Sequence, residues 1–301
     1  MTVQFKEALK KARGIQVDEA YYASTYEDNI YPPQMAEKHI RMFCKGEGKE
    51  LFPKDGKKEK AACIYSSSML AYNFFSWVNE EHPLHLGGIT YNKVVFEEQF
   101  RVLQNRNNKA NIDVALVSND EKTILLFESK FTEQFSQSKV DIKEAYDDSD
   151  SYFDSGEEWI RVFKQIEERM KKDEKTYFEG LKQVACHLIG ISSVIRNHHA
   201  REWFNQNSWL HHINDITLSE NKNYIFKSLV FHPKTKEESD RTADYMAKND
   251  AFVSGITFLP KNLSIENPII TYRDVWDAGL RESIKDEELR HFLENYLLVH
   301  V

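Results

Sequence analysis

The chain has 301 residues, of which 41% are hydrophobic and 13% aromatic, so it can bury the core of one large domain or of two modest ones. Its formal net charge of −8 excludes a surface that is basic all over, so a nucleic-acid partner would need a local positive groove. The three cysteines, Cys44, Cys63 and Cys186, form no CxxC pair and no regular pattern, which excludes a disulfide framework and a cysteine-based zinc site.

The N-terminal residues carry charges throughout and contain no apolar stretch of the kind found in secretory signals. No run of residues approaches the roughly 18 apolar positions that a membrane span requires. We therefore expect a cytoplasmic protein in a reducing compartment, with no membrane partner.

Residues 1–61 predict a helical N-terminal extension. An amphipathic helix comes first, a Tyr-Pro-Pro break follows at residues 31–33, and a second helix covers about residues 35–43. We place the main domain at residues 62–301, where Ser66 supplies the N-cap of an aromatic-rich helix.

Residues 90–103 read TYNKVVFEEQFRVL and set two acids, Glu97 and Glu98, next to each other. Their side chains would point in opposite directions on a strand and about 100° apart on a helix, so only one of them can face a given site. A solvated acidic pair is the alternative interpretation.

Residues 110–131 (ANIDVALVSNDEKTILLFESKF) predict a β-hairpin. The strands cover residues 112–117 and 123–131, because both runs are rich in aliphatic and β-branched side chains and Ser-Asn-Asp at 118–120 supplies a turn between them.

Three charged residues interrupt these apolar strands. Side chains alternate across a strand, so Glu128 and Lys130 lie side by side on one face, and Asp113 on the first strand comes alongside them if the register allows. Burying three charges among aliphatic side chains is costly unless they are paired or hold a metal. In the plainer interpretation, Asp113 caps a strand end and Glu128 and Lys130 form a solvated pair.

An aspartate followed, after a turn, by Glu-x-Lys at the end of a hydrophobic strand resembles the core motif of the PD-(D/E)XK nuclease superfamily, with Asn111-Ile112 here in place of the family's proline. The resemblance implies an α/β fold of the restriction-endonuclease type, in which a mixed central β-sheet is flanked by helices. It also implies that Asp113 and Glu128 bind Mg²⁺ or Mn²⁺, and that Lys130 assists the attacking water or the phosphate.

The resemblance implies two further site residues. Members often carry a glutamate before the aspartate strand that completes the metal shell, and of the two candidates we favour Glu97. Several branches also carry a glutamine on a helix, where it contacts the water or the metal shell. Residues 180–195 have apolar positions at helical spacing, with Gln183 at the edge of the stripe and His187 one turn further on. In the alternative interpretation, Gln183 and His187 are polar residues at the edge of the buried face of a core helix.

The implied function is metal-dependent hydrolysis of DNA phosphodiester bonds by an endo- or exonuclease. The alternative is a catalytically silent relative of the same fold that serves as a nucleic-acid-binding or interaction module. The intact set of Asp113, Glu128 and Lys130 favours the enzyme, because a silent relative has no need to keep three buried charges. The form of the nucleic acid is left open, as is a homodimer.

Residues 139–175 predict an insertion between the hairpin and the helix at 180–195. Its acidic run at 147–158 lacks the spacing and closing glutamate of a calcium loop, so we expect a mobile loop.

Adjacent histidines at 198–199 and 211–212 would lie about 100° apart on a helix and could not easily chelate one ion, so we expect a helix end or a surface patch there. Two later runs, residues 224–232 and 252–259, predict core strands, and residues 271–301 predict a helical tail.

Overall fold

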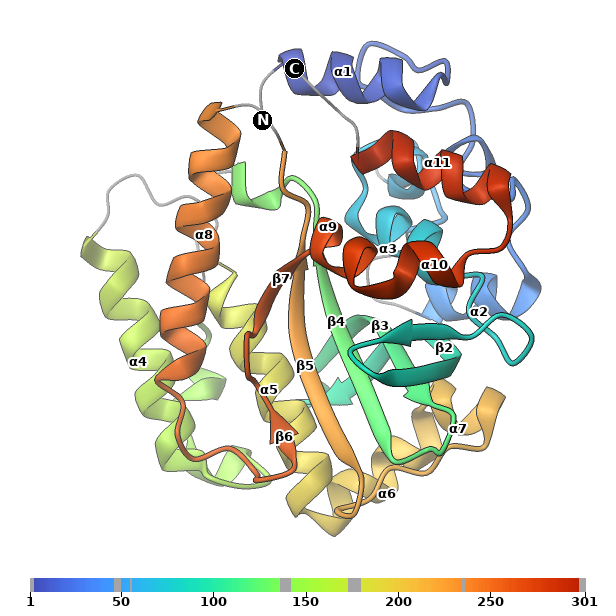
Figure 1. Cartoon of the computed structure of the whole chain (residues 1–301). Coiled ribbons are helices and arrows are strands. Elements are labelled where there is room, and N and C mark those ends of the chain that lie inside the picture. The colour runs from blue at the N-terminus through green and yellow to red at the C-terminus, as the bar shows by residue number, and fades with distance from the viewer. Residues whose placement is uncertain are drawn as a thin grey trace.

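The computed structural model is a mixed α/β fold with a seven-stranded central sheet and helices on both of its faces (Figure 1). It describes residues 3–45, 50–54, 56–135, 142–172, 180–233 and 236–297. The strand order is β1-β2-β3-β4-β5-β6, and β7 also pairs with β5. This arrangement confirms the predicted fold class.

The sheet is antiparallel from β1 to β4 and parallel from β4 onward. The antiparallel part comprises β1 (Leu84–Leu86), β2 (Ile89–Arg101), β3 (Lys109–Ser118) and β4 (Thr123–Lys130). The parallel part adds β5 (Asn223–Val230), β6 (Leu263–Ser264) and β7 (Ile269–Thr271). The predicted hairpin is therefore β3 and β4, and the predicted strand at 224–232 is β5.

The prediction of a strand over residues 252–259 is wrong. Helix α8 (Lys236–Ser254) continues into that segment, and β6 and β7 supply the edge of the sheet. The reason is topological: β5 and its next parallel neighbour cannot be joined by a hairpin, so the chain must cross over, here through α8.

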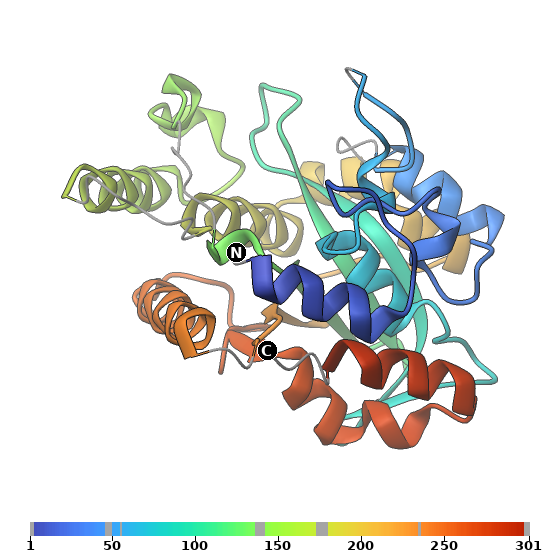
Figure 2. The same ribbon diagram turned by 90° about the horizontal axis from the view of Figure 1, so that it is seen from above.

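Two layers of helices enclose the sheet (Figures 1 and 2). One layer contains α5 (Leu181–Arg196) and α8, with α4 (Gly156–Lys172) packed outside α5. The opposite layer contains α3 (Ser67–Phe75), α1 (Val3–Arg13), α2 (Glu37–Lys45) and the C-terminal elements α9 (Tyr272–Val275), η6 (Trp276–Leu280), α10 (Arg281–Ser283) and α11 (Glu287–Leu297). Helices α6 (His198–Asn207) and α7 (Trp209–Asn214) lie against β2.

Short 3₁₀ turns complete the described structure: η1 (Glu27–Asn29), η2 (Lys60–Ala62), η3 (Glu133–Phe135), η4 (Glu144–Tyr146) and η5 (Ser149–Ser151). Ser66 caps α3 as predicted, because its side chain accepts a hydrogen bond from the backbone N–H of Met69. The tail is mostly helical as predicted: Thr271 ends β7, helical elements cover Tyr272–Ser283 and Glu287–Leu297, and residues 298–301 lie outside the described residues. No helix in the described segments is both long and apolar enough to cross a bilayer.

The N-terminal extension shares its core with the sheet. Phe5 of α1 packs edge-on against Phe131, which follows β4, at a ring distance of 6.2 Å. The buried guanidinium of Arg13 donates hydrogen bonds to Asn29 and to the hydroxyl of Tyr296 on α11. These contacts tie the two ends of the chain to one another and to the end of β4.

The predicted insertion at 139–175 contains a packed helix. Trp159 and Phe163 of α4 are buried, and α4 lies against α5. The expectation of a loop over residues 147–158 holds only up to Gly156, where α4 begins, because the apolar face of the helix finds cover on α5. The ends of the insertion, 139–141 and 173–175, lie outside the described residues.

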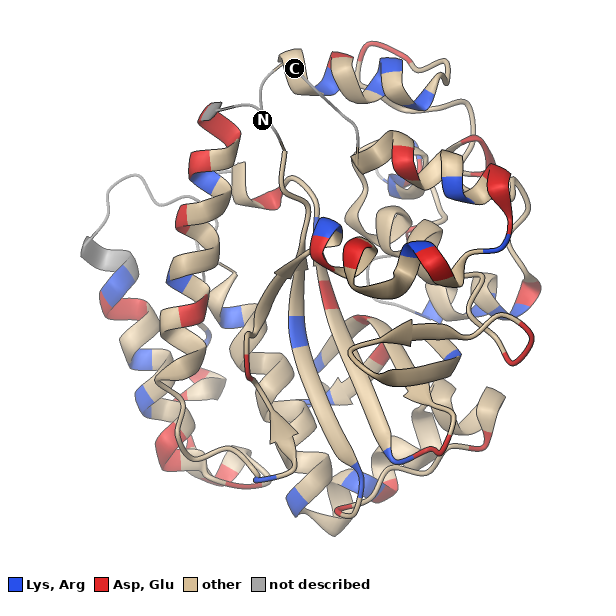
Figure 3. Ribbon diagram, in the orientation of Figure 1, with Lys and Arg blue, Asp and Glu red and all other residues tan. Residues whose placement is uncertain are grey.

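The charged side chains lie mostly on the outer helices and loops, with both signs interspersed, while the strands carry few of them (Figure 3). Against that background the charges on β2, β3 and β4 stand apart. Helix α5 reaches this part of the sheet closely, because a Cβ atom at Gly190 would lie only 2.5 Å from Cβ of Phe100 on β2.

We expect Gly190→Ala to destabilise the protein. Overpacking at this contact costs about 1–3 kcal/mol, and the better helix propensity of alanine offsets roughly 1 kcal/mol, which leaves a net loss of up to about 2 kcal/mol. Denaturant unfolding would show a lower midpoint with an unchanged slope. The control is Ser192→Ala on the same helix, whose buried hydroxyl makes no hydrogen bond within the described residues and whose loss should not destabilise. Equal midpoints for Gly190→Ala and wild type would contradict the close approach of α5 to β2.

Candidate active site

Strands β2, β3 and β4 bring three carboxylates into one row, which we call the acidic row: Glu97, Asp113 and Glu128. On β2 and β3, Phe96 pairs with Val114 and Glu98 pairs with Ile112. Glu97 therefore lies opposite Asp113. The β3–β4 register, continued by one residue beyond its last pair, sets Asp113 opposite Glu128. The two strands separate at this point, and Asp113 Oδ2 accepts a hydrogen bond of 2.6 Å from the backbone N–H of Ser129.

Alternation along β4 sends its charged residues to the α5 face. Lys130 Nζ donates a hydrogen bond of 2.6 Å to Glu128 Oε1, and His187 Nε2 of α5 lies 2.9 Å from Glu128 Oε2, an ion-pair distance. Phe127, the residue before Glu128, stacks on Phe75 of α3 at 5.4 Å on the opposite face. Glu128, Lys130 and His187 are all at most 5% exposed, so the interpretation of Glu128 and Lys130 as a solvated pair is wrong.

Neighbouring charges shift the pKa values of both Glu128 and Lys130. Burial alone would raise the pKa of Glu128, but the charges and hydrogen bonds of Lys130 and His187 outweigh it and lower that pKa to about 2. Burial would likewise lower the pKa of Lys130, yet Glu128 above all holds it above its usual value. At neutral pH the two residues therefore form a buried ion pair.

The pKa values of the other two carboxyl groups in the acidic row are shifted in the opposite direction, upward. Burial, followed by the charges of Glu128 and Glu97, raises the pKa of Asp113 well above its usual range. Burial and the neighbouring acid Glu50 raise the pKa of Glu97 to about 7, against a hydrogen bond that Asn111 donates to it. The pKa values of two carboxyl groups of the row are thus raised, first by burial and second by the other acids gathered at the same place.

The adjacent acids Glu97 and Glu98 serve different places. Both are buried, which overturns the alternative of a solvated pair. Glu98 accepts hydrogen bonds from Ser208 Oγ at 3.0 Å and from the backbone N–H of Leu210 at 2.9 Å, so it caps the first turn of α7. Of the two, Glu97 is the one whose charge acts on Asp113.

The backbone at Glu97 is left-handed, with a φ of 53°, which is uncommon for a residue other than glycine. Phe96 and Phe100 would share a face on a regular strand. In this strand Phe96 stacks on Phe43 of α2, whereas Phe100 packs against Phe204 of α6 and approaches α5. Strand β2 therefore changes face at Glu97, and strain of this kind, of about 1–3 kcal/mol, is frequent at functional sites.

Helix α5 contributes His187 to the cluster directly. Gln183, the residue expected at the site, is half-buried one turn earlier on the same helix, and it is His187 that contacts Glu128. The spacing of Gln183 and His187 already indicated that both lie on one helix face. Tyr245 of α8, whose buried hydroxyl faces the charge of Lys130, had no signal in the sequence, because α8 reaches the site only through the crossover.

The donor set suits a hard divalent cation. Carboxylate oxygens are the ligands that Mg²⁺ and Mn²⁺ prefer. Ser228 on β5 lies opposite Glu128, and its buried hydroxyl makes no hydrogen bond within the described segments, so a polar group or water has a place there. The three carboxylates do not yet converge: among the described residues the group of ligand atoms within 4.8 Å of one another lies elsewhere, at α6.

A family model described as restriction endonuclease associating with ARP matches residues 4–211, which is more than half of the chain. The chain belongs to this restriction-endonuclease family. The match begins in α1 and ends in α7, so it includes the acidic row, Lys130 and His187. No curated protein and no solved structure shows significant similarity to the chain.

We expect Asp113→Asn to stabilise this restriction-endonuclease family member in metal-free buffer. Because the pKa of Asp113 is raised in the folded state, its ionisation costs folding free energy at any pH above the unfolded value of about 3.9. Asparagine can still accept the hydrogen bond from Ser129 but carries no charge. Its gain at pH 7 should be about 0.5–2 kcal/mol, the usual range for one stabilising substitution, and should shrink as the pH falls towards 4.

Urea unfolding of both proteins between pH 4 and pH 8 measures this difference. The matched control is Asp120→Asn in the turn of the same hairpin, because hydrogen bonds from Ser118 and from the backbone of Lys122 lower the pKa of Asp120. That variant should be less stable than the wild type by a nearly constant amount from pH 4 to pH 8, because the stability that the lowered pKa of Asp120 provides is lost only at more acidic pH. If Asp113→Asn instead unfolds the chain, the prediction is wrong and Asp113 is a structural residue.

Proposed function

We propose that this protein is a metal-dependent nuclease of the PD-(D/E)XK superfamily that hydrolyses phosphodiester bonds of DNA. The observation that carries the proposal is the acidic row beside a buried lysine, in a chain of a restriction-endonuclease family. Glu97 and Glu128 are buried and Asp113 is half-buried. Because the pKa values of Glu97 and Asp113 are raised, their ionisation destabilises the fold unless a cation joins them, and natural proteins keep such costs mainly at functional sites.

Asp113 and Glu128, completed by Glu97, would hold Mg²⁺ or Mn²⁺. When bound, the ion would stabilise the charge that develops on the scissile phosphate and lower the pKa of the attacking water. The strained backbone at Glu97 fixes the third carboxylate at the row. Gln183, half-buried on the same face of α5 as His187, is the proposed contact to the water or the metal shell.

Lys130 would act on the substrate rather than on the metal, because an ammonium group only donates hydrogen bonds. Its raised pKa keeps it protonated at neutral pH, which fits a donor to the phosphate or to the attacking water better than a general base. His187 would hold Glu128 from the opposite side and is therefore a positioning residue.

The catalytically silent module is the second candidate, and one observation favours it. Both oxygens of Glu128 are already engaged, one by Lys130 and the other by His187, so this carboxylate is compensated without a metal. In that case the pair serves the fold alone, and the protein binds nucleic acid or a partner without cleavage.

We expect the melting temperature of the wild type to rise as Mg²⁺ or Mn²⁺ is added, by the equivalent of about 2.7 kcal/mol at a hundredfold excess over the dissociation constant. The double variant Asp113→Asn/Glu128→Gln should show no metal-dependent rise, whatever its starting melting temperature. Asp120→Asn serves as the control for an unspecific effect of losing one acid on this hairpin. An equal rise in the double variant would remove the metal site.

Cleavage should depend on Lys130 separately from metal binding. Lys130→Ala and the bulkier Lys130→Met should keep or increase the metal-induced thermal shift, because the metal no longer competes with an ammonium group for Glu128. Cleavage should fall on the order of 10²-fold or more, the scale for loss of one preorganised donor. Lys130→Arg should restore it only in part, since the guanidinium is larger and differently shaped.

The assay is a panel of plasmid, linear duplex, single-stranded and branched DNA with Mg²⁺ and Mn²⁺. Lys227→Ala, on the neighbouring strand β5, is the control, because that ammonium group donates to the backbone of Glu266 and Asn267 outside the cluster. Circular dichroism would establish that each variant is folded, since removing one partner of a buried pair can cost about 3–5 kcal/mol. Unchanged cleavage by Lys130→Met would place the activity elsewhere, and binding without cleavage by the wild type would favour the silent module.

A further inference from the structure

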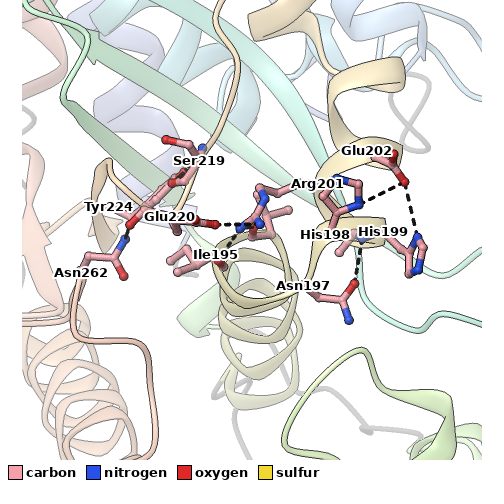
Figure 4. Close-up of polar contacts among 12 residues, drawn as sticks. Ile195, Asn197, His198, His199, Arg201, Glu202, Ser219, Glu220, Tyr224 and Asn262 are labelled. Atoms are coloured by element: carbon pink, nitrogen blue, oxygen red, sulfur yellow. Dashed lines mark hydrogen bonds and ion pairs between the residues drawn. The ribbon is translucent and has the colours of Figure 1, made fainter.

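The histidines at 198–199 open α6 and are exposed, which confirms the expected helix end and surface patch. The expectation that they could not easily chelate one ion did not consider Glu202, with which they form three potential metal ligands away from the acidic row. His198 and His199 open the helix, and Glu202 follows one turn later. Glu202 Oε2 lies 3.5 Å from His198 Nδ1 and 3.4 Å from His199 Nδ1 (Figure 4). One ligand atom from each of the three residues lies within 4.8 Å of the other two.

These separations fit tetrahedral coordination. Zinc binds imidazole nitrogen and carboxylate oxygen at roughly 2.0–2.1 Å, which places two ligands of a tetrahedron about 3.4 Å apart. Two of the three ligand-to-ligand separations in the cluster already have this length. The third needs only a rotation of two side chains that are largely exposed.

The surrounding contacts hold the cluster in place. Asn197 Oδ1 accepts hydrogen bonds from the backbone N–H groups of His199 and Ala200, which fixes the start of the helix. Arg201, the neighbouring cation, is turned away: it pairs with Glu220 at 2.7 Å and donates to the carbonyl of Ile195 at 2.6 Å (Figure 4). The carboxylate of Glu202 therefore faces the two imidazoles without competition from Arg201.

We propose that His198, His199 and Glu202 form a surface site for Zn²⁺ or a similar borderline divalent ion, with one coordination position open to water or to a group from outside the chain. Two imidazoles and one carboxylate are the ligand set of zinc sites that keep an open position, whereas Mg²⁺ prefers oxygen ligands alone. The positive end of the helix dipole opposes a cation here, which weakens the site but does not change its ligand set.

The chain contains a natural comparison with the same spacing. His211, His212 and Asp215 repeat the pattern of two adjacent histidines and an acid four residues after the first. Asp215 lies just past the end of α7 in a left-handed conformation, with its carboxylate 3.9 Å from His211, while His212 Nε2 contacts the carbonyl of Gln206. In the described residues these three do not form a group of converging ligand atoms. Helix α6 continues through Glu202, whereas α7 ends before Asp215. Because of this difference, the ligand atoms converge in the first of the two clusters and not in the second.

The test is isothermal titration of the full chain, prepared without a histidine tag, with ZnCl₂, together with the visible absorption of bound Co²⁺ as a probe of tetrahedral geometry. The variants His198→Ala/His199→Ala and Glu202→Gln should weaken zinc binding by at least the roughly 10- to 100-fold that even the loss of an outer-shell partner costs. They should also lose the intense bands of tetrahedral Co²⁺. All three side chains are exposed, so the variants should fold.

Two controls separate this site from the others. His211→Ala/His212→Ala should bind zinc like the wild type, and Asp113→Asn/Glu128→Gln should keep the tetrahedral Co²⁺ bands, whatever zinc it no longer binds at the acidic row. Tetrahedral Co²⁺ bands that survive His198→Ala/His199→Ala, or that are lost with His211→Ala/His212→Ala, would overturn the proposal. The result is independent of nuclease activity, so failure of the proposed function leaves this test intact.

Discussion

The ion pair between Glu128 and Lys130 is the interaction on which the arrangement of the site depends. Two charges buried on a central strand require each other, because breaking such a pair costs about 3–5 kcal/mol. The pair also requires α5 to supply His187, and α5 can approach only because Gly190 leaves room for Phe100. A single buried pair thus sets constraints on a strand, a helix and their packing distance.

The sheet places acids where its regular pairing is interrupted. β3 and β4 separate beyond Val114, and the backbone N–H of Ser129, freed from the ladder, donates to Asp113. β2 changes face at Glu97 through a left-handed residue. Each irregularity lies at a carboxylate of the acidic row, and each has an energetic cost that a purely structural sheet would not need.

The two proposed metal sites differ in ligand chemistry and in exposure. In the acidic row Glu97 and Glu128 are buried, Asp113 is half-buried, and all three offer oxygen ligands, whereas the cluster on α6 is exposed and contains two imidazoles. Several basic residues outside the site are paired internally, as Lys58 is with Asp18 and Arg196 with Asp154. Such pairing matches a net charge of −8, so the proposed binding of DNA would depend on local groups near the row.

Local pattern by itself determined the hairpin, the alternation that joins Glu128 to Lys130, the N-cap at Ser66 and the apolar face of α5, because each depends on residues close in the chain. The tertiary structure alone decided which of Glu97 and Glu98 faces the row, since a bend in β2 and the start of α7 make that choice. It also decided that residues 252–259 belong to a crossover helix and its exit, that α4 packs inside the expected loop, and that His187 rather than Gln183 reaches Glu128. These outcomes depend on packing between separate segments of the chain or on the topology of a parallel sheet, and neither leaves a periodic trace in the sequence.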